Sequence, residues 1–269
     1  MNIQETIKRL RKRSVWTMSQ RAALASLFLC SLTACHAPHH TELTVSVAAS
    51  LTDAIQEIET VYHNDHPGVE IRNNFGSSGT LAREIENGAP VDVFLSAASK
   101  PMDDLQTRGL IVAGSRRNLL RNTLVLIAPR GTKLSGFQQL ADPSVHTIAL
   151  GDPASVPAGQ YGQQVLAGLH LLDSVHSRLV LAKDVRQVLA YVETGNADAG
   201  IVYATDALTT NGVQVVAVAP EASHDPIVYP AAAIARGKHE DAAREFVEFL
   251  NSAPARAIFL KHGFTMALQ

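Results

Sequence analysis

Short apolar runs alternate with amphipathic runs from residue 42 onward, and this alternation is the strongest constraint on the fold of the chain. The apolar runs predict strands at residues 43–48, 69–73, 91–95, 123–128, 147–150, 179–182, 199–203, 213–218 and 227–231. The amphipathic runs predict helices at residues 51–64, 79–87, 101–108, 159–169, 185–194, 240–251 and 254–262. Strands that alternate with helices form βαβ units. We therefore expect an α/β protein with mixed, mainly parallel sheets.

The alternating region is rather long for a single sheet of this kind, so two lobes are expected. Hydrophobic residues make up 46% of the chain, which is enough to build two cores. No Gly/Ser-rich linker, internal repeat or low-complexity stretch occurs after residue 41. The two lobes are therefore expected to be joined by ordered segments of the chain.

The N-terminal segment has the features of a secretion signal. Residues 1–21 contain six basic side chains and one acidic side chain, and residues 22–34 form a largely apolar run. That run is too short to remain in a membrane as a spanning helix. The sequence Leu-Thr-Ala-Cys, which ends at Cys35, resembles the lipobox of bacterial lipoproteins. The resemblance implies a signal peptide over residues 1–34, acylation of the Cys35 thiol and a short tether over residues 35–41.

The long basic region is compatible with a translation start at Met1 or at Met18, and the sequence leaves both open. The only other cysteine, Cys30, lies within the signal, so the mature chain can form no internal disulfide and no cysteine metal site. The histidines of the tether, together with His63 and His66, could bind a metal. A solvated tether and surface or capping roles are the favoured interpretation of these histidines.

Polar residues rich in hydrogen-bond donors stand where predicted strands end and helices begin. They are Ser50, the segments 75–80, 156–159 and 183–186, and Tyr203. In open α/β sheets, ligands bind beyond the carboxyl ends of the strands. Helix starts carry unpaired N–H groups and partial positive charge, so several of them at one point could hold an anion without Lys or Arg. For each junction taken alone, an ordinary helix cap is the favoured interpretation.

Three side chains at these junctions predict how the helices begin. Asp53, three residues after Ser50, is expected to form a near capping box. Pro157 suits the first position of a helix, and Asp184 is expected to cap the helix over residues 185–194. The formal net charge of −2 argues against nucleic acid as a partner, because proteins that bind nucleic acid carry a basic face.

At the same junctions, the sequence resembles the periplasmic molybdate-binding protein family. The matching motifs are AASLTDA (48–54), FGSSGTLA (75–82), GAPVDVF (88–94), GDPASVPAG (151–159), ETGNADAGIVY (193–203) and FLKHGF (259–264). They occur in order and cover essentially all of residues 42–267. The resemblance implies a two-lobed periplasmic binding protein (type II) with a hinge of two crossovers. One lobe would comprise residues 42–122 plus 228–269, and the other would comprise residues 123–227.

The resemblance also assigns five residues to an oxyanion site. Ser50, Ser78 and Tyr203 would contribute hydroxyl donors. Main-chain N–H groups would come from the same two serines and from Ala158 and Val185, where the apolar side chains are no objection. No catalytic residue, cofactor or direct cation ligand is implied.

Two features near this site leave alternatives open. The second motif reads Phe-Gly-Ser-Ser-Gly, where many relatives have Ala and Ser in place of Gly76 and Gly79. This departure leaves Ser77 or Ser78 as the serine that supplies the hydroxyl. Tyr229, like most other tyrosines of the chain, is expected to be a packing residue.

The function implied is capture of molybdate, and also tungstate, outside the cytoplasm by a monomer with a lipid anchor in the membrane. The partners would be the permease and the ATP-binding subunit of an ABC importer. Molybdate carries no proton at neutral pH and only accepts hydrogen bonds, whereas phosphate would need an acceptor in the site. Sulfate or thiosulfate binding on the same fold is the alternative. A hydrolase is disfavoured because Ser78 lies in Gly-Ser-Ser-Gly and not in Gly-x-Ser-x-Gly.

Overall fold

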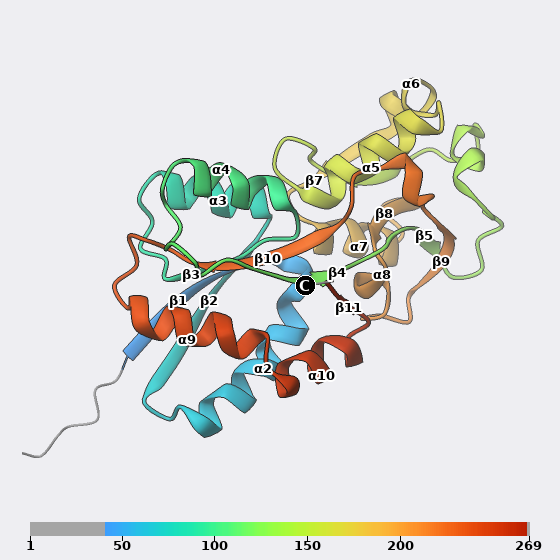
Figure 1. The fold of residues 1–269 in the computed structure, drawn as a ribbon. Helices are drawn as coiled ribbons and strands as arrows, with labels where there is room; N and C mark the ends of the chain where they lie inside the picture. The colour runs from blue at the N-terminus through green and yellow to red at the C-terminus, as the bar shows by residue number, and fades with distance from the viewer. Residues whose placement is uncertain (1–40, 268–269) are drawn as a thin grey trace, which may run out of the picture. The chain divides into compact units, whose positions relative to one another are not determined.

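The structure is a computed structural model that describes residues 41–267 (Figure 1). The predicted signal peptide and Cys35 lie outside these residues. The predicted tether is also outside them except for Thr41, which already belongs to the first strand. Within residues 41–267, no helix has both the length and the apolar character needed to cross a membrane.

The first sheet has six strands in the order β11-β4-β10-β3-β1-β2. Its strands are β1 (Thr41–Ala48), β2 (Val69–Gly76), β3 (Val93–Leu95), β4 (Arg117–Arg121), β10 (Val228–Ala233) and β11 (Thr265–Met266). The helices that accompany it are α2 (Thr52–Asp65), α3 (Ser78–Glu86), α4 (Ser99–Thr107), α9 (Glu240–Leu250) and α10 (Ala253–Lys261). Figure 1 shows α3 and α4 on one face of this sheet and α2, α9 and α10 on the other.

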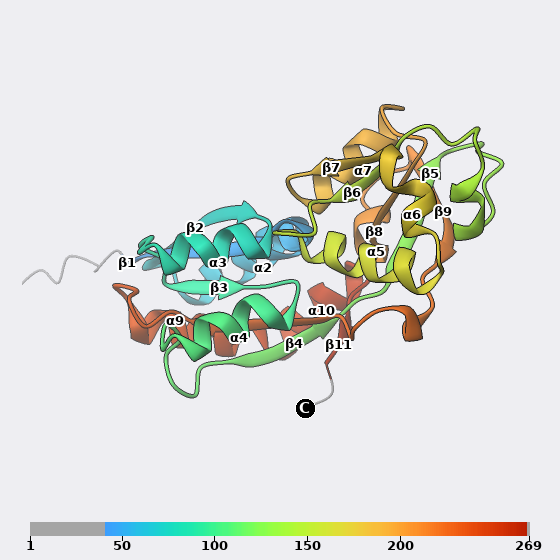
Figure 2. The same cartoon turned by 90° about the horizontal axis from the view of Figure 1, so that it is seen from above.

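The second sheet has five strands in the order β7-β6-β8-β5-β9. Its strands are β5 (Leu124–Pro129), β6 (Ile148–Gly151), β7 (Leu179–Ala182), β8 (Ala199–Tyr203) and β9 (Val213–Val218). The helices of this part are α5 (Pro157–Gly168), α6 (Leu172–Val175), α7 (Val185–Glu193) and α8 (Ala204–Ala207). Helices α5 and α7 pack against β6 and β8, as Figure 2 shows. Short 3₁₀ turns η1 (Ala49–Leu51), η2 (Phe137–Ala141), η3 (His176–Arg178) and η4 (Glu221–Ser223) complete the described elements.

Both sheets are mixed, as predicted. Of the nine strand pairings within residues 41–267, four are parallel and five are antiparallel, so parallel pairings are fewer than expected. The cause is one reversed strand in the interior of each sheet, together with the short edge strand β11, which is antiparallel to β4. Strand β10 is antiparallel to both β3 and β4, and β5 is antiparallel to both β8 and β9. These two strands follow the places where the chain passes from one sheet to the other.

Most elements lie within a few residues of the predicted ranges, and β4 is the main element that the sequence analysis missed. Its sequence, Arg117–Arg121, has only Leu119 and Leu120 as apolar residues, and both are buried. Two adjacent apolar residues between arginines show neither strand alternation nor helical spacing. Pairing with β10 on one side and β11 on the other makes this segment a strand.

The strands that lead to the helix starts are held by buried apolar side chains. In β1, Leu43, Val45 and Val47 are fully buried, and every residue of β8 is buried. Burial of this kind contributes roughly 25 cal/mol per Å² of apolar surface. Burial of β1 and β8 therefore fixes the positions of the turns that follow their carboxyl ends.

The end of β6 packs directly against the first turn of α5. A Cβ atom at Gly159 would lie 1.9 Å from the carbonyl oxygen of Gly151, a distance at which atoms overlap. Only glycine at position 159 allows this approach. The contact sets the place of the first turn of α5 relative to the sheet.

We expect Gly159→Ala to lower the free energy of unfolding by about 1–3 kcal/mol or more, because the helix start must move away from β6. Chemical denaturation of the ligand-free protein measures this change. Gly136→Ala is the matched control, since its backbone is extended (φ 177) and no atom lies within 4 Å of the added methyl group. Equal stabilities of the two variants would contradict the packing argument.

Candidate functional site

A small cavity lies where turns that follow strands of both sheets meet. All five residues assigned to the oxyanion site line it: Ser50, Ser78, Ala158, Val185 and Tyr203. The cavity encloses about 210 Å³ of space between atoms, its mouth included. Its free interior is only about 10 Å³, which is about the space of one water molecule. A ligand held here must therefore be compact.

Four of these residues stand at helix starts, where a main-chain N–H group has no acceptor within the helix. Ser78 and Val185 are the first residues of α3 and α7. Ala158 is the second residue of α5, and Ser50 is the second residue of the 3₁₀ turn η1. All four residues are buried, so water does not replace the missing acceptors freely. Partial positive charge from several helix starts thus accumulates at one point.

Two of the three predictions about helix starts are confirmed, and one is wrong. Pro157 stands in the first turn of α5, and the Asp184 carboxylate accepts the N–H of Gln187 at 2.8 Å as the cap of α7. Asp53 makes no capping bond at the start of α2. Its carboxylate turns away from its own helix and pairs with Arg186.

The two adjacent serines of the second motif have different partners. Ser77 caps α3, because its Oγ accepts the N–H of Thr80 at 3.4 Å and donates to Thr80 Oγ1 at 2.9 Å. Ser78 Oγ instead accepts the main-chain N–H of Ala97 at 2.8 Å and is fully buried. The Ser78 hydroxyl hydrogen is therefore available to a ligand, while the Ser77 hydroxyl is already used within its helix.

Tyr203 is the last residue of β8 and is buried, with 1% of its surface exposed. Its hydroxyl donates to the carbonyl oxygen of Ala97 at 3.3 Å, a long hydrogen bond. Burial raises the pKa of the Tyr203 phenol well above its usual value. The hydroxyl thus keeps its proton at neutral pH and remains a donor.

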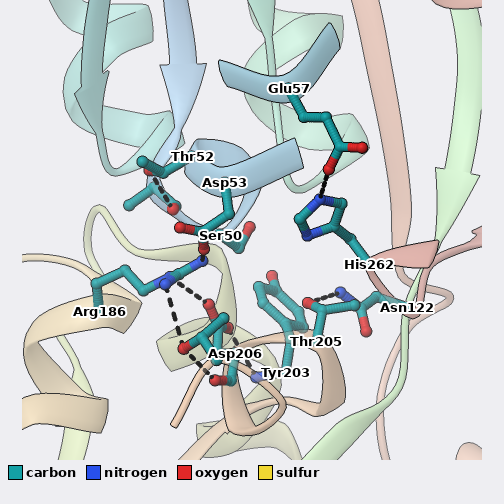
Figure 3. Close-up of polar contacts among 12 residues, drawn as sticks. Ser50, Thr52, Asp53, Glu57, Asn122, Arg186, Tyr203, Thr205, Asp206 and His262 are labelled. Carbon is teal, nitrogen blue, oxygen red and sulfur yellow. Dashed lines mark hydrogen bonds and ion pairs between the residues drawn. The ribbon is translucent and has the colours of Figure 1, made fainter. Parts of the chain in front are cut away.

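An ion-pair network that the sequence analysis missed borders the cavity (Figure 3). Arg186, next to Val185 on α7, lies 2.5 Å from the Asp53 carboxylate of α2 and 2.9 Å from the Asp206 carboxylate of α8. Asp206 also accepts the N–H of Tyr203 at 3.3 Å. The network links the helix start at Val185, the strand end at Tyr203 and the first helix of the six-stranded sheet. Spacing along the chain gave no signal for it, since the three charges come from distant segments.

The histidines that could have formed a metal site do not meet in the described part of the chain. His63 is exposed, while His66 stacks on Tyr62 and contacts the Glu245 carboxylate at 3.1 Å. Among residues 41–267, no three His, Cys, Asp or Glu side chains are grouped closely enough to hold a metal ion.

Comparison with known proteins identifies the family. Residues 43–265 match the family described as bacterial extracellular solute-binding protein. The chain belongs to this family. Its members are substrate-binding proteins and not enzymes, in line with the prediction from the sequence.

Individual relatives of this solute-binding protein agree with the resemblance seen in its motifs. The molybdate-binding protein ModA of Haemophilus influenzae is 40% identical over 83% of this chain and 90% of its own length. ModA of Escherichia coli is 39% identical over 84% of this chain and 89% of its own length. Among solved structures, the periplasmic molybdate-binding protein of Azotobacter vinelandii aligns with a TM-score of 0.76 and 27% identity, over 84% of this chain and all of that one. The predicted resemblance to molybdate-binding proteins and the predicted two-lobed periplasmic binding fold are confirmed.

Asp206 gives a test of the network through its response to pH. Burial raises the pKa of the Asp206 carboxyl from 3.8 to about 7 in the folded protein, although Arg186 acts in the opposite direction. Between about pH 4 and about pH 7, folding therefore takes up a proton at Asp206. The stability that Asp206 contributes is fully present below about pH 4 and is lost as the pH rises to about 7. We expect the unfolding free energy of the wild type, relative to that of Asp206→Asn, to fall by a few kcal/mol across this range, at about 1.4 kcal/mol per pKa unit.

Urea unfolding of both ligand-free proteins at about pH 4.5 and about pH 8 measures this difference. Asp206→Asn is the reference because it keeps the shape of the side chain and does not titrate. If the unfolding free energies of the wild type and Asp206→Asn differ by the same amount at both pH values, Arg186 keeps Asp206 ionised in the folded protein.

Proposed function

We propose that this solute-binding protein captures molybdate outside the cytoplasm and delivers it to the permease and ATP-binding subunit of an ABC importer. The observation that carries this proposal is the cavity lined by Ser50, Ser78, Ala158, Val185 and Tyr203. Every one of these residues offers a hydrogen-bond donor. Relatives at 40% and 39% identity bear the name molybdate-binding protein.

The chemistry of the cavity matches an anion without a proton. The one charged residue that lines it is Asp184, and one oxygen of its carboxylate accepts the N–H of Gln187. Hydrogen bonds to a charged group contribute about 1.5–3 kcal/mol each, so several donors offset much of the loss of hydration. Hydrogenphosphate would bring a proton that needs an acceptor, whereas the five assigned residues are proposed as donors. Tungstate has the same shape and charge as molybdate, and we expect it to bind as well.

We infer that the two sheets are the cores of two lobes, with one lobe at residues 42–122 plus 228–269 and the other at residues 123–227. Ser50 and Ser78 belong to the first lobe, and Ala158, Val185 and Tyr203 belong to the second. Binding would close the lobes around the anion, as in other proteins of this architecture. The donors of one lobe alone would complete only part of the anion's coordination.

The lipobox at Cys35 supports a lipid anchor on the extracytoplasmic side of a membrane. Each buried methylene of an acyl chain contributes about 0.8 kcal/mol to membrane attachment. The anchor would keep the protein close to its permease. We expect the acylated protein to act as a monomer.

Isothermal titration calorimetry of a tag-free protein that begins after Cys35 tests the proposed ligand. We expect tight one-to-one binding of molybdate and tungstate, much weaker binding of sulfate, and no measurable binding of phosphate. Tight binding of sulfate alone would contradict molybdate as the ligand and leave an oxyanion site of the same kind. Binding of none of the four anions would contradict the function proposed for the cavity.

The pair Ser77 and Ser78 gives a matched test of the site itself. We expect Ser78→Ala to weaken molybdate binding about 10- to 100-fold, because one hydrogen bond to the anion is lost. Ser77→Ala removes the α3 cap and should cost about 1 kcal/mol of stability while leaving the affinity of the folded protein within about threefold. The reverse order of affinities would assign the ligand hydroxyl to Ser77.

A further inference from the structure

Ser50 is the first member of a chain of hydrogen bonds that runs from the cavity to the segments joining the two sheets. Tyr229 Oη lies 3.1 Å from Ser50 Oγ and 3.1 Å from Asn122 Nδ2. Asn122 stands between β4 and β5, and Tyr229 is in β10. Figure 3 shows Asn122 beside Thr205, close to Ser50 and Tyr203. The three residues of this chain are therefore contributed by distant parts of the sequence.

The direction of these hydrogen bonds is fixed at the Asn122 end. The main-chain N–H of Thr123 can only donate, and it lies 2.8 Å from Asn122 Oδ1. The amide oxygen must therefore face Thr123, and the amide nitrogen must face Tyr229 and Thr205. Asn122 Nδ2 donates to Thr205 Oγ1 at 2.9 Å with one hydrogen and to Tyr229 Oη with the other.

The next bond joins Tyr229 Oη to Ser50 Oγ, and either oxygen could supply its hydrogen. Tyr229 Oη already accepts from Asn122, so donation of its own hydrogen to Ser50 Oγ would use both the acceptor and the donor side of this hydroxyl. Tyr229 is 1% exposed, and its ring packs edge-on against Tyr203 and Phe264 at centroid distances of 5.6 Å and 5.5 Å. Burial raises the pKa of the Tyr229 phenol well above its usual value, so the phenol keeps the hydrogen that it donates. With Tyr229 as the donor, Ser50 Oγ is an acceptor on this side and its own hydroxyl hydrogen is left for the cavity.

We propose that Asn122 and Tyr229 are positioning residues that hold the Ser50 hydroxyl as a hydrogen-bond donor to the bound oxyanion. This inference rests on the proposed function, because it requires an oxyanion at Ser50. Ser78 shows the same arrangement, since the N–H of Ala97 fills the acceptor side of its hydroxyl. Both serines would thus direct their hydroxyl hydrogens to the ligand.

A double-mutant cycle distinguishes positioning through Ser50 from simple packing. Tyr229→Phe keeps the ring and removes the donor to Ser50, and we expect it to weaken oxyanion binding roughly 3- to 10-fold. Ser50→Ala is expected to weaken binding about 10- to 100-fold. If Tyr229 acts through Ser50, the double variant binds no more weakly than Ser50→Ala alone. If Tyr229 only packs, the two losses multiply and the proposal is overturned.

Asn122→Asp gives a second test with little change of shape. A carboxylate only accepts, so the Tyr229 hydrogen would turn toward residue 122 and Ser50 would have to donate to Tyr229. We expect a larger loss of affinity than in Tyr229→Phe, because the new charge also repels the anion. When Ser50 is already replaced by Ala, Asn122→Asp should weaken binding only by this repulsion. An undiminished loss of affinity in that background would contradict positioning through Ser50.

Tyr62→Phe is the matched control, because its hydroxyl is buried in α2 and has no hydrogen-bond partner among the described residues. It should leave the affinity for oxyanions unchanged. A loss equal to that of Tyr229→Phe would show that removal of any buried phenol has this effect, and it would overturn the proposal.

The cycle is measured by calorimetry with molybdate and with sulfate as probes, so that the two proposals can fail separately. If the wild type binds molybdate and the affinity losses of the two single variants multiply, the positioning proposal is overturned and the proposed function stands. If the wild type binds sulfate but not molybdate, the proposed function is contradicted, and the cycle measured with sulfate still tests the positioning proposal. Failure to bind either anion overturns both.

Discussion

A buried dianion loses its hydration shell, and each of its oxygens must then meet a hydrogen-bond donor in the protein. At the proposed site this requirement would fall on main-chain N–H groups at helix starts and on the hydroxyls of Ser50 and Ser78. The Tyr203 hydroxyl would have to exchange its bond to the Ala97 carbonyl oxygen for one to the anion. Hydroxyl groups can also accept, so their hydrogens must be directed. Ala97 N–H donates to Ser78 Oγ, and we propose that the Tyr229 hydroxyl does the same for Ser50 Oγ. The donor character of the cavity therefore depends on residues that do not touch the ligand.

The scaffold holds these donors in place through contacts of the strand ends. Gly151 and Gly159 let α5 begin against β6, which places Ala158 at the cavity. Arg186 joins α7 to Asp53 of α2 and to Asp206, beside the two donors Val185 and Tyr203. Asn122 and Tyr229 lie where the chain passes between the sheets, so movement of one sheet relative to the other would also affect Ser50. The site and the connections between the sheets are thus one hydrogen-bonded unit.

Much of this arrangement could be predicted from the sequence. Apolar periodicity located most strands and helices, and the motifs placed Ser50, Ser78, Ala158, Val185 and Tyr203 at one site, where the structure brings them together. Local signals also predicted the caps at Pro157 and Asp184, because a cap depends on neighbours along the chain. Contacts between distant segments could not be predicted, because no local pattern in the sequence encodes them. Asp53 resembled a capping residue but pairs with Arg186, and Tyr229 resembled a packing residue but also bonds to Ser50.

The most direct test of an anion site in which only donors meet the ligand is a crystal structure of the protein with molybdate, in which anomalous scattering locates the metal. The account predicts one molybdenum atom in the cavity. Its oxygens should be within hydrogen-bond distance of N–H and O–H groups only, with Ser50 Oγ and Ser78 Oγ among them. Molybdenum at another place, or a carboxylate or carbonyl oxygen in contact with the anion, would contradict it.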